Sequence, residues 1–165
     1  MLKAKQILDE IEVPFWLDCG TLLWMYRDGI PDEKDTDFAI HEKDLYKLLG
    51  NLDRFLENGF TLYKIWTYKN YINEISFMYE GKKVDIFITY FKRNWGIHIA
   101  NWPYEGLTTK MPRKMYEELE TLNDTWLVPS QTEKYLEMYY TKDWRTPDPN
   151  WQATDPPCID KEFEL

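Results

Sequence analysis

The sequence predicts a single α+β domain with a mixed sheet flanked by helices, and three features of the chain support that class. Residues 1–60 alternate short apolar runs with helical patterns. Residues 60–90 change to β-rich runs separated by turn residues. No internal repeat and no linker divides the chain, so we expect one domain over residues 1–165, with a Pro-rich extended tail from about residue 145.

The composition is that of an acidic globular protein of 165 residues. The chain has 20 Lys and Arg residues against 29 Asp and Glu residues, a formal net charge of −9, with 44% hydrophobic residues. This balance argues against capture of nucleic acid, which needs a basic face. The apolar runs, such as Ile86–Ile88, fall far short of the ~20 residues of a membrane span, and the N-terminus lacks the features of a signal peptide. We therefore expect a cytoplasmic protein in which Cys19 and Cys158 are reduced.

The first elements follow from apolar spacing and helix-breaking residues. Apolar side chains at helical spacing predict a helix over Leu2–Glu12, which ends before Pro14. Phe15–Leu17 is expected to form a short buried strand. A glycine turn follows, after which Thr21 is expected to cap a helix over Leu22–Arg27.

A second strand and a longer helix come before the β-rich part of the chain. Phe38–Ile40 closes the strand, and apolar positions at helical spacing predict a helix from about Leu45 to Asn58. Three β-rich runs follow, and we expect them to form neighbouring antiparallel strands. These runs are Phe60–Trp66, Tyr71–Tyr79 and Lys83–Tyr90.

The remaining third of the chain shows weaker periodicity. The run Trp95–Pro112 is rich in Gly, Pro, Asn and aromatic residues, so we expect irregular structure over the sheet, a common place for binding groups. Ser130 and Glu133 have the spacing of a capping box that opens a helix through about Tyr140. The prolines after Trp144 predict an extended or partly disordered tail.

Two acidic residues, Asp35 and Asp37, begin an apolar strand and are the most informative residues of the chain. Residues two apart on a strand point to the same side, so both carboxylates face one point. Like charges repel there unless a cation lies between them, and Mg²⁺ (or Mn²⁺) prefers such oxygen ligands. The alternative for the isolated pair is a solvated turn.

A third acid, Asp85, lies inside the apolar run Val84–Ile88. A carboxylate buried there must be paired, protonated or bound to a metal. It joins the acidic pair, lies at a sheet edge, or pairs with a neighbouring cation. The candidate cations are Lys82, Lys83 and Arg93. We interpret Asp35, Asp37 and Asp85 together as a catalytic metal site.

Five other residues are candidates for substrate binding. Gly20 and Thr21 would place N–H groups and the positive end of a helix dipole at an anion, unless they form only a tight turn. Arg27 either reaches a phosphate through its forked donors or pairs with a nearby surface acid. His98 either donates to a phosphate or is a satisfied structural histidine. Lys34, beside the acidic pair, completes the set.

In this order, the motifs resemble the nucleotidyltransferase fold of the polymerase-β superfamily, and within it the LicD family, which includes fukutin and the fukutin-related protein. The N-terminal resemblance rests on Phe15–Leu23, Tyr26–Arg27, Gly29–Pro31 and Asp35–Asp37. The second acidic motif is Val84–Phe87. The C-terminal motif comprises Val128–Pro129, Tyr135–Glu137, Tyr139, Asp143–Trp144 and Pro147. The resemblance spans about residues 15–147.

The resemblance implies a transferase that moves a phosphorylated alcohol, such as phosphocholine or ribitol phosphate, from a CDP-activated donor to a glycan or other hydroxyl acceptor. Carried over to this chain, the three acids would hold Mg²⁺ or Mn²⁺, Gly20–Thr21 would hold the donor phosphates, and Arg27 would support them. The chain departs from the family pattern at three places. Asp32–Lys34 stands where a Trp and further acids are common, Trp24 stands where a Gly is common, and Tyr140–Lys142 replaces a Tyr-Gly pair.

Aromatic residues offer a site for the alcohol if it is choline, because a quaternary ammonium is held by aromatic faces. The candidates are Trp95, Trp102 and Tyr104, although such rings equally build the core of a small domain. Two other functions remain open. One is transfer of a nucleotidyl group from an NTP to a small molecule, protein or RNA. The other is a non-catalytic module that binds a glycan or a partner, against which the retention of three acids argues.

Overall fold

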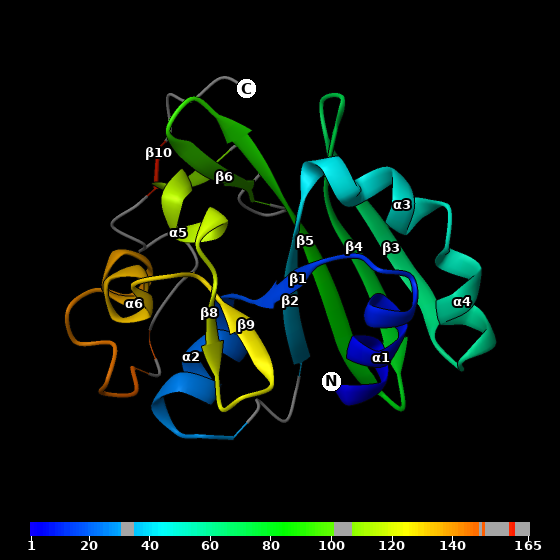
Figure 1. The fold of residues 1–165 in the computed structure, drawn as a ribbon, viewed down its shortest axis with the longest axis horizontal. Coiled ribbons are helices and arrows are strands. Elements are labelled where there is room, and N and C mark those ends of the chain that lie inside the picture. The colour runs from blue at the N-terminus through cyan, green and yellow to red at the C-terminus, as the bar shows by residue number, and fades with distance from the viewer. Residues whose placement is uncertain (31–34, 101–106, 149, 151–158, 161–165) are drawn as a thin grey trace.

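A mixed sheet forms the centre of the computed structural model, which describes residues 1–30, 35–100, 107–148, 150 and 159–160 (Figure 1). The strands of this sheet are β1 (Phe15–Leu17), β2 (Asp35–His41), β3 (Thr61–Tyr68), β4 (Tyr71–Tyr79), β5 (Lys82–Lys92), β6 (Trp95–Ile99), β7 (Thr108–Pro112) and β10 (Ile159–Asp160). They lie in the order β1–β2–β5–β6–β7–β10, and β4 joins β3 to β5. A separate hairpin pairs β8 (Glu120–Leu122) with β9 (Trp126–Val128).

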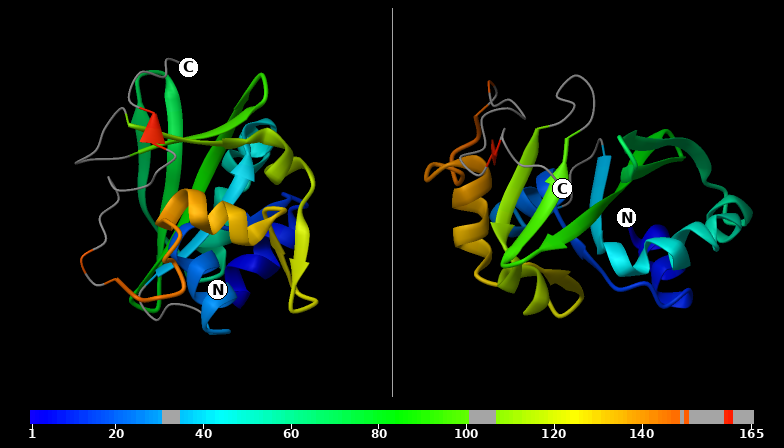
Figure 2. Two further views of the ribbon diagram at one scale, coloured as in Figure 1. Left: turned by 90° about the vertical axis from the view of Figure 1, so that its left-hand side faces the viewer. Right: turned by 90° about the horizontal axis from the view of Figure 1, so that it is seen from above.

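Helices flank the sheet, which confirms the predicted α+β class. They are α1 (Leu2–Glu10), α2 (Cys19–Arg27), α3 (Leu45–Leu49), α4 (Leu52–Glu57), α5 (Arg113–Glu117) and α6 (Thr132–Tyr140), with the 3-10 helix η1 (Glu42–Asp44) before α3. Helices α1, α3 and α4 lie against the part of the sheet that contains β3 and β4, whereas α2 and α6 lie on the other side of β2 (Figure 2). No helix in the described ranges is long and apolar enough to cross a membrane.

Strand pairing brings distant acidic residues together. Strand β2 runs parallel to β5, whereas β3, β4 and β5 are antiparallel neighbours, as the sequence predicts. The register pairs Asp37 with Asp85 across β2 and β5, and Ser76 with Asp85 across β4 and β5. Because paired residues on neighbouring strands point to the same side, these three side chains share one face of the sheet.

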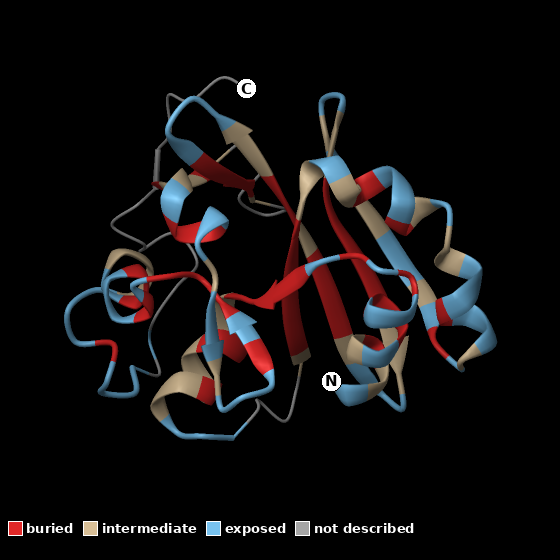
Figure 3. Cartoon of the chain, viewed as in Figure 1, coloured by how far each residue is buried: buried red, intermediate tan, exposed pale blue. Residues whose placement is uncertain are grey.

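The opposite face of the same strands is apolar. Ile75 and Phe77 of β4 are fully buried, and the ring of Phe77 stacks on Phe55 of α4 with 4.5 Å between centroids. Buried residues line the central strands (Figure 3). The alternation of side chains therefore separates a hydrophobic core under α4 from a polar face that carries the acids.

The helix predicted over Leu22–Arg27 begins at Cys19, and Asp18 rather than Thr21 caps it. The backbone of Asp18 is extended, and its Oδ1 accepts a hydrogen bond of 2.8 Å from the Cys19 N–H, the first N–H of the helix. The prediction that Thr21 is the cap was wrong because its hydroxyl is used elsewhere, by the backbone of β2.

The single helix predicted over 45–58 is divided into α3 and α4. Gly50 ends α3, and the Asn51 side chain donates a hydrogen bond of 2.8 Å to the carbonyl of Lys47, one of the carbonyls that the end of a helix leaves free. The apolar spacing continues across this break, which is why the sequence pattern alone does not reveal it.

The prediction of irregular structure over Trp95–Pro112 was wrong at both ends, which form β6 and β7. Gly96 suggested a loop, but the ring of Tyr116 packs directly on it, and a Cβ at this position would lie 2.4 Å from that ring. The absence of a side chain at Gly96 therefore lets the Tyr116 ring pack against the strand. Residues 101–106, including Trp102 and Tyr104, lie outside the described residues.

The predicted helix near the C-terminus is confirmed as α6, but without the capping box. Gln131 precedes the helix with a left-handed φ of 52°, and the Ser130 hydroxyl is buried without a hydrogen-bond partner. Glu133 instead forms an ion pair of 2.7 Å with Arg145. Most of the predicted Pro-rich tail lies outside the described residues, and within it Ile159–Asp160 pairs antiparallel with β7.

Candidate functional site

The carboxylates of Asp37 and Asp85 form the centre of the candidate site. Both residues are buried, with 9% and 2% of their surface exposed, and Asp35 is half-buried two residues before Asp37. Burial raises the pKa of Asp37 well above its usual range, and the charges of Asp85 and Asp35 raise it further. The charges of Asp85 and Asp35 therefore repel that of Asp37, which is the like-charge repulsion that the sequence predicts for these acids.

The first turn of α2 is bound to β2 at Asp37. The Thr21 N–H donates to Asp37 Oδ2 over 3.1 Å, and the Asp37 N–H donates to Thr21 Oγ1 over 2.7 Å. The Asp18 N–H donates to the Asp37 carbonyl over 3.1 Å. A Cβ on Gly20 would lie 3.2 Å from Asp37 Oδ2, so glycine lets the helix start approach the carboxylate closely.

This arrangement gives Gly20 and Thr21 a different place from the one that the sequence suggested. The Thr21 N–H is occupied by Asp37, so this group positions a carboxylate in the structure described here. Gly20 lines the cavity described below. The helix start therefore connects the acids to the neighbouring cavity.

Asp18 lies at the centre of a buried polar cluster beneath α2. It is fully buried, and its Oδ1 accepts hydrogen bonds from the Cys19 N–H and the Tyr135 hydroxyl. Its Oδ2 lies 3.5 Å from His98 Nε2, which is 2.6 Å from the Thr89 hydroxyl. Sequence analysis missed Asp18, although an Asp directly before a helix is a recognised capping signal.

His98 is buried in this cluster with 7% of its surface exposed. Burial lowers the pKa of His98, although the charge of Asp18 acts in the opposite direction. The ring also lies near the rings of Phe87 and Tyr116. These contacts favour the structural alternative over phosphate binding.

Asp85 has one oxygen paired and one without a partner. Its Oδ2 lies 2.7 Å from the ammonium nitrogen of Lys83, whereas Oδ1 is buried with no N–H or hydroxyl donor, and the Glu74 carboxyl lies within hydrogen-bond reach of the Asp85 side chain. The carboxylate thus pairs with one of the cations that the sequence offered. A buried carboxylate oxygen without a partner is uncommon and suits a site that takes up a further ligand.

Two further residues, Glu74 and Ser76 of β4, lie on the same face of the sheet as Asp85, and the sequence did not reveal them. Both are buried, and the Ser76 hydroxyl donates a hydrogen bond to Glu74 Oε1. Burial, followed by the charge of Asp85, raises the pKa of Glu74 to about 8. The available signal was a Glu in a strand otherwise rich in apolar residues, beside the strand that carries Asp85.

No three His, Cys, Asp or Glu side chains in the described ranges form a ready group for holding a metal ion. Two observations nevertheless fit a divalent cation at the acids. Asp37 and Asp85 are paired in register with mutually repelling charges, and Asp85 Oδ1 lacks a partner. Carboxylate oxygens are also the ligands that Mg²⁺ prefers.

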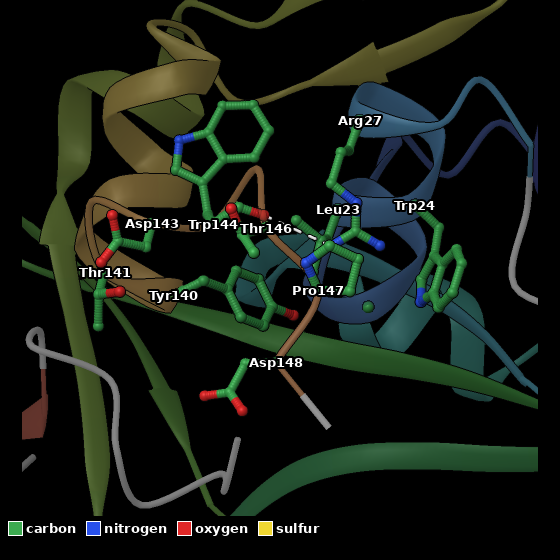
Figure 4. Close-up of a pocket in the computed structure, with 11 residues that line it drawn as sticks. Leu23, Trp24, Arg27, Tyr140, Thr141, Asp143, Trp144, Thr146, Pro147 and Asp148 are labelled. Carbon is green, nitrogen blue, oxygen red and sulfur yellow. Dashed lines mark hydrogen bonds between the residues drawn. The ribbon is translucent and has the colours of Figure 1, made fainter. Parts of the chain in front are cut away.

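A cavity of about 870 Å³ lies beside the start of α2. Residues of α2 form one wall, and the end of α6 with the segment that follows it forms the other (Figure 4). The lining residues are Gly20, Leu23, Trp24, Arg27, Tyr140, Thr141, Asp143, Trp144, Thr146, Pro147 and Asp148. Its size suits a small-molecule ligand, and its aromatic side chains come from both walls.

Arg27, for which the sequence suggested a phosphate contact, is one of the residues that line this cavity. Its guanidinium pairs with Asp28 at 2.8 Å and donates to the Trp144 carbonyl over 3.4 Å, the contact marked in Figure 4. The ion pair with Asp28 agrees with the alternative of a surface acid, whereas the phosphate contact stays a prediction. Trp24, the departure from the family pattern, lines the cavity as well.

Of the two remaining candidates, Trp95 does not line the cavity, and Lys34 is not among the residues that the structure describes. Trp95 lies on β6, where the Lys110 ammonium is 4.8 Å from its ring centroid. Lys34 lies outside the described residues.

Two solved structures of other proteins have a similar fold. The crystal structure of the lincosamide antibiotic adenylyltransferase LnuA, with lincomycin bound, matches with a TM-score of 0.54 and 12% identity, over 86% of this chain and 84% of that chain. The solution structure of the antibiotic-resistance factor ANT(2'')-Ia matches with a TM-score of 0.51 and 14% identity, over 92% and 74%. These likenesses show the nucleotidyltransferase-like fold that the sequence predicts.

Similar proteins of known name and a matching family description identify the family of this chain. Ribitol-5-phosphate transferase FKTN of Mus musculus is 32% identical over 94% of this chain, and FKTN of Homo sapiens is 30% identical over the same share. The chain spans 35% of the length of these relatives. Residues 12–141 match the family described as LicD/FKTN/FKRP, nucleotidyltransferase domain. The chain therefore belongs to the LicD/FKTN/FKRP nucleotidyltransferase-domain family.

Proposed function

We propose that the chain is a metal-dependent transferase that moves a phospho-alcohol group from a CDP-activated donor to the hydroxyl of a glycan or other small acceptor. The observation that carries this proposal is the position of Asp37 and Asp85. They lie side by side in register, one of their oxygens lacks a partner, and the helix start bound to Asp37 also lines the cavity of about 870 Å³.

Asp35, Asp37 and Asp85 would hold Mg²⁺ or Mn²⁺, which would neutralise charge on the donor phosphates. Thr21 and Gly20 fix the position of Asp37 from the start of α2. Arg27, which lines the cavity, would contact a donor phosphate through its guanidinium. Asp85 is the carboxylate that we assign to accept the proton of the acceptor hydroxyl.

Ribitol and choline are the two alcohols that a binding experiment should compare. The curated relatives are named ribitol-5-phosphate transferases, which makes ribitol phosphate the first group to test. Phosphocholine is the alternative, and the aromatic residues Trp24, Tyr140 and Trp144 of the cavity offer faces for its quaternary ammonium. A cytoplasmic location and a single domain over residues 1–165 stay predictions.

A thermal-shift series tests the proposal directly. Wild type and the double variant Asp35→Asn/Asp37→Asn are compared with Mg²⁺ or Mn²⁺, each combined with CDP-ribitol, CDP-choline, CTP, ATP, GTP or UTP. We expect a metal-dependent rise in melting temperature with one CDP-alcohol, and no rise in the variant.

Other outcomes would favour the other functions. A rise with an NTP alone would indicate nucleotidyl transfer to a small molecule, protein or RNA. No rise with any nucleotide would indicate a non-catalytic module that binds a glycan or a partner. A positive result is followed by an assay for release of CMP in the presence of candidate acceptors, because binding alone does not demonstrate transfer.

A further inference from the structure

Lys83 and Asp85 lie two residues apart on β5, so their side chains project from the same face of the sheet. The Lys83 ammonium nitrogen lies 2.7 Å from Asp85 Oδ2. The Asp85 side chain is only 3% exposed, whereas that of Lys83 is 38% exposed. The ammonium therefore reaches the buried carboxylate from the solvent side.

Several acids act on Lys83 at once. Lys83 contacts Asp85 directly and is paired in register with Asp35 across β5 and β2. Its ammonium thus balances part of the negative charge that gathers on this face. A carboxylate as deeply buried as Asp85 needs such a partner in the absence of another cation.

We propose that Lys83 is a built-in counter-ion that neutralises Asp85 in the metal-free protein and leaves Asp85 Oδ2 when a divalent cation binds. This inference rests on the proposed metal-dependent function and adds a residue that controls metal affinity. The ammonium and the cation compete for the same carboxylate. The flexible and partly exposed Lys83 side chain reaches water when it is displaced, so displacement does not bury a charge.

The competition predicts that removing the ammonium strengthens metal binding. The test measures Mn²⁺ binding by titration calorimetry without nucleotide, together with the melting temperature of the metal-free protein. The variants are Lys83→Gln, Lys83→Arg and Lys82→Gln. Lys82 is the exposed neighbour on the same strand, so its variant removes one positive charge without removing the contact to Asp85.

We expect Lys83→Gln to bind Mn²⁺ about tenfold more tightly than wild type and to melt at a lower temperature without metal, because Asp85 loses its partner. Lys83→Arg keeps the charge and should remain within about twofold of the wild-type affinity. Lys82→Gln should change neither quantity. Equal or weaker Mn²⁺ binding by Lys83→Gln, with normal binding by wild type, overturns the role of Lys83 alone. No Mn²⁺ binding by wild type and Lys83→Gln overturns the metal-dependent function and this role together.

A second measurement uses the wild-type protein, in case Lys83→Gln does not fold. Limited acetylation of lysines is followed by mass spectrometry with and without Mg²⁺. We expect Mg²⁺ to increase the modification of Lys83 relative to Lys82, because the displaced amine leaves the carboxylate. An unchanged or decreased ratio overturns the proposal.

Discussion

The two faces of β4 and β5 are both buried but are built from opposite kinds of residue. On one face Phe77 and Ile75 pack under α4, with the Phe77 ring stacked on Phe55. On the other face Glu74 and Asp85 are equally inaccessible, and their charges act on each other. Burial therefore stabilises the fold on one face, whereas on the other face it raises the pKa of an acid. Substitutions on the two faces should therefore have opposite consequences.

The largest effect is expected from Asp37→Asn, which removes charge from the polar face without changing its shape. Turnover should fall by about 10³-fold or more, since a carboxylate that would hold the cation is lost. The metal-free protein should melt at the same or a higher temperature, because the raised pKa of Asp37 shows that its charge is unfavourable when folded. Asp53→Asn, at an exposed position of α4, is the control for both assays. Turnover retained in Asp37→Asn would contradict the assignment.

Phe77→Ala should have the largest effect on stability, because it acts on the apolar face. Phe77 is fully buried, so we expect a loss of about 3–5 kcal/mol in the free energy of unfolding, measured with urea. Leu56→Ala is the matched control on α4, where Leu56 is 50% exposed, and should change stability by about 0.5 kcal/mol or less. Similar losses in the two variants would mean that this face is not the core of the domain.

Glu74→Gln tests the polar face through pH. The pKa of Glu74 is raised in the folded protein from 4.5 to about 8, so the stability it contributes is fully present below pH 4.5 and is lost as the pH rises through about 8. Glutamine is neutral at every pH, so the Glu74→Gln variant does not lose stability in this pH range. At pH 8.5 the free energy of unfolding of metal-free Glu74→Gln should therefore exceed that of wild type by about 3–5 kcal/mol, and at pH 4.5 the two should be similar. A parallel pH dependence of the two proteins would contradict the raised pKa.

The smallest effect is expected from Arg27→Gln, beside the polar face in the cavity. We expect about tenfold weaker binding of the CDP-alcohol and unchanged Mn²⁺ binding, because one charged phosphate contact is removed. Arg54→Gln is the control, since Arg54 lies on α4, outside the lining of the cavity. Calorimetric titration measures both affinities. Equal donor affinity in wild type and Arg27→Gln would show that Arg27 is only an ion-pair partner of Asp28.

The sequence predicted the parts of the site that follow from local alternation. The spacing of Asp35 and Asp37 and the apolar run around Asp85 were enough to place the acids on strands, and the structure pairs Asp37 with Asp85. The residues that were missed depend on contacts across the sheet. Glu74 joins the site only because β4 pairs with β5, and a single strand pattern contains no information on that register.

Two wrong predictions, at Gly96 and at Thr21, have the same physical cause. Gly96 looks like a loop residue until Tyr116, from α5, is seen to pack on it. Thr21 looks like a helix cap until its hydroxyl is seen to accept a hydrogen bond from Asp37. In both positions tertiary contact overrides local propensity, which a sequence pattern cannot express.

The parallel pairing of β2 with β5 also has a consequence for how the protein is made. Asp37 and Asp85 lie about fifty residues apart in the chain, and β3 and β4 lie between them in sequence. The two acids become neighbours only after a long loop has closed, against their own repulsion. A chain that ends before β5 therefore carries Asp35 and Asp37 without Asp85, and the three acids come together only when β5 has paired with β2.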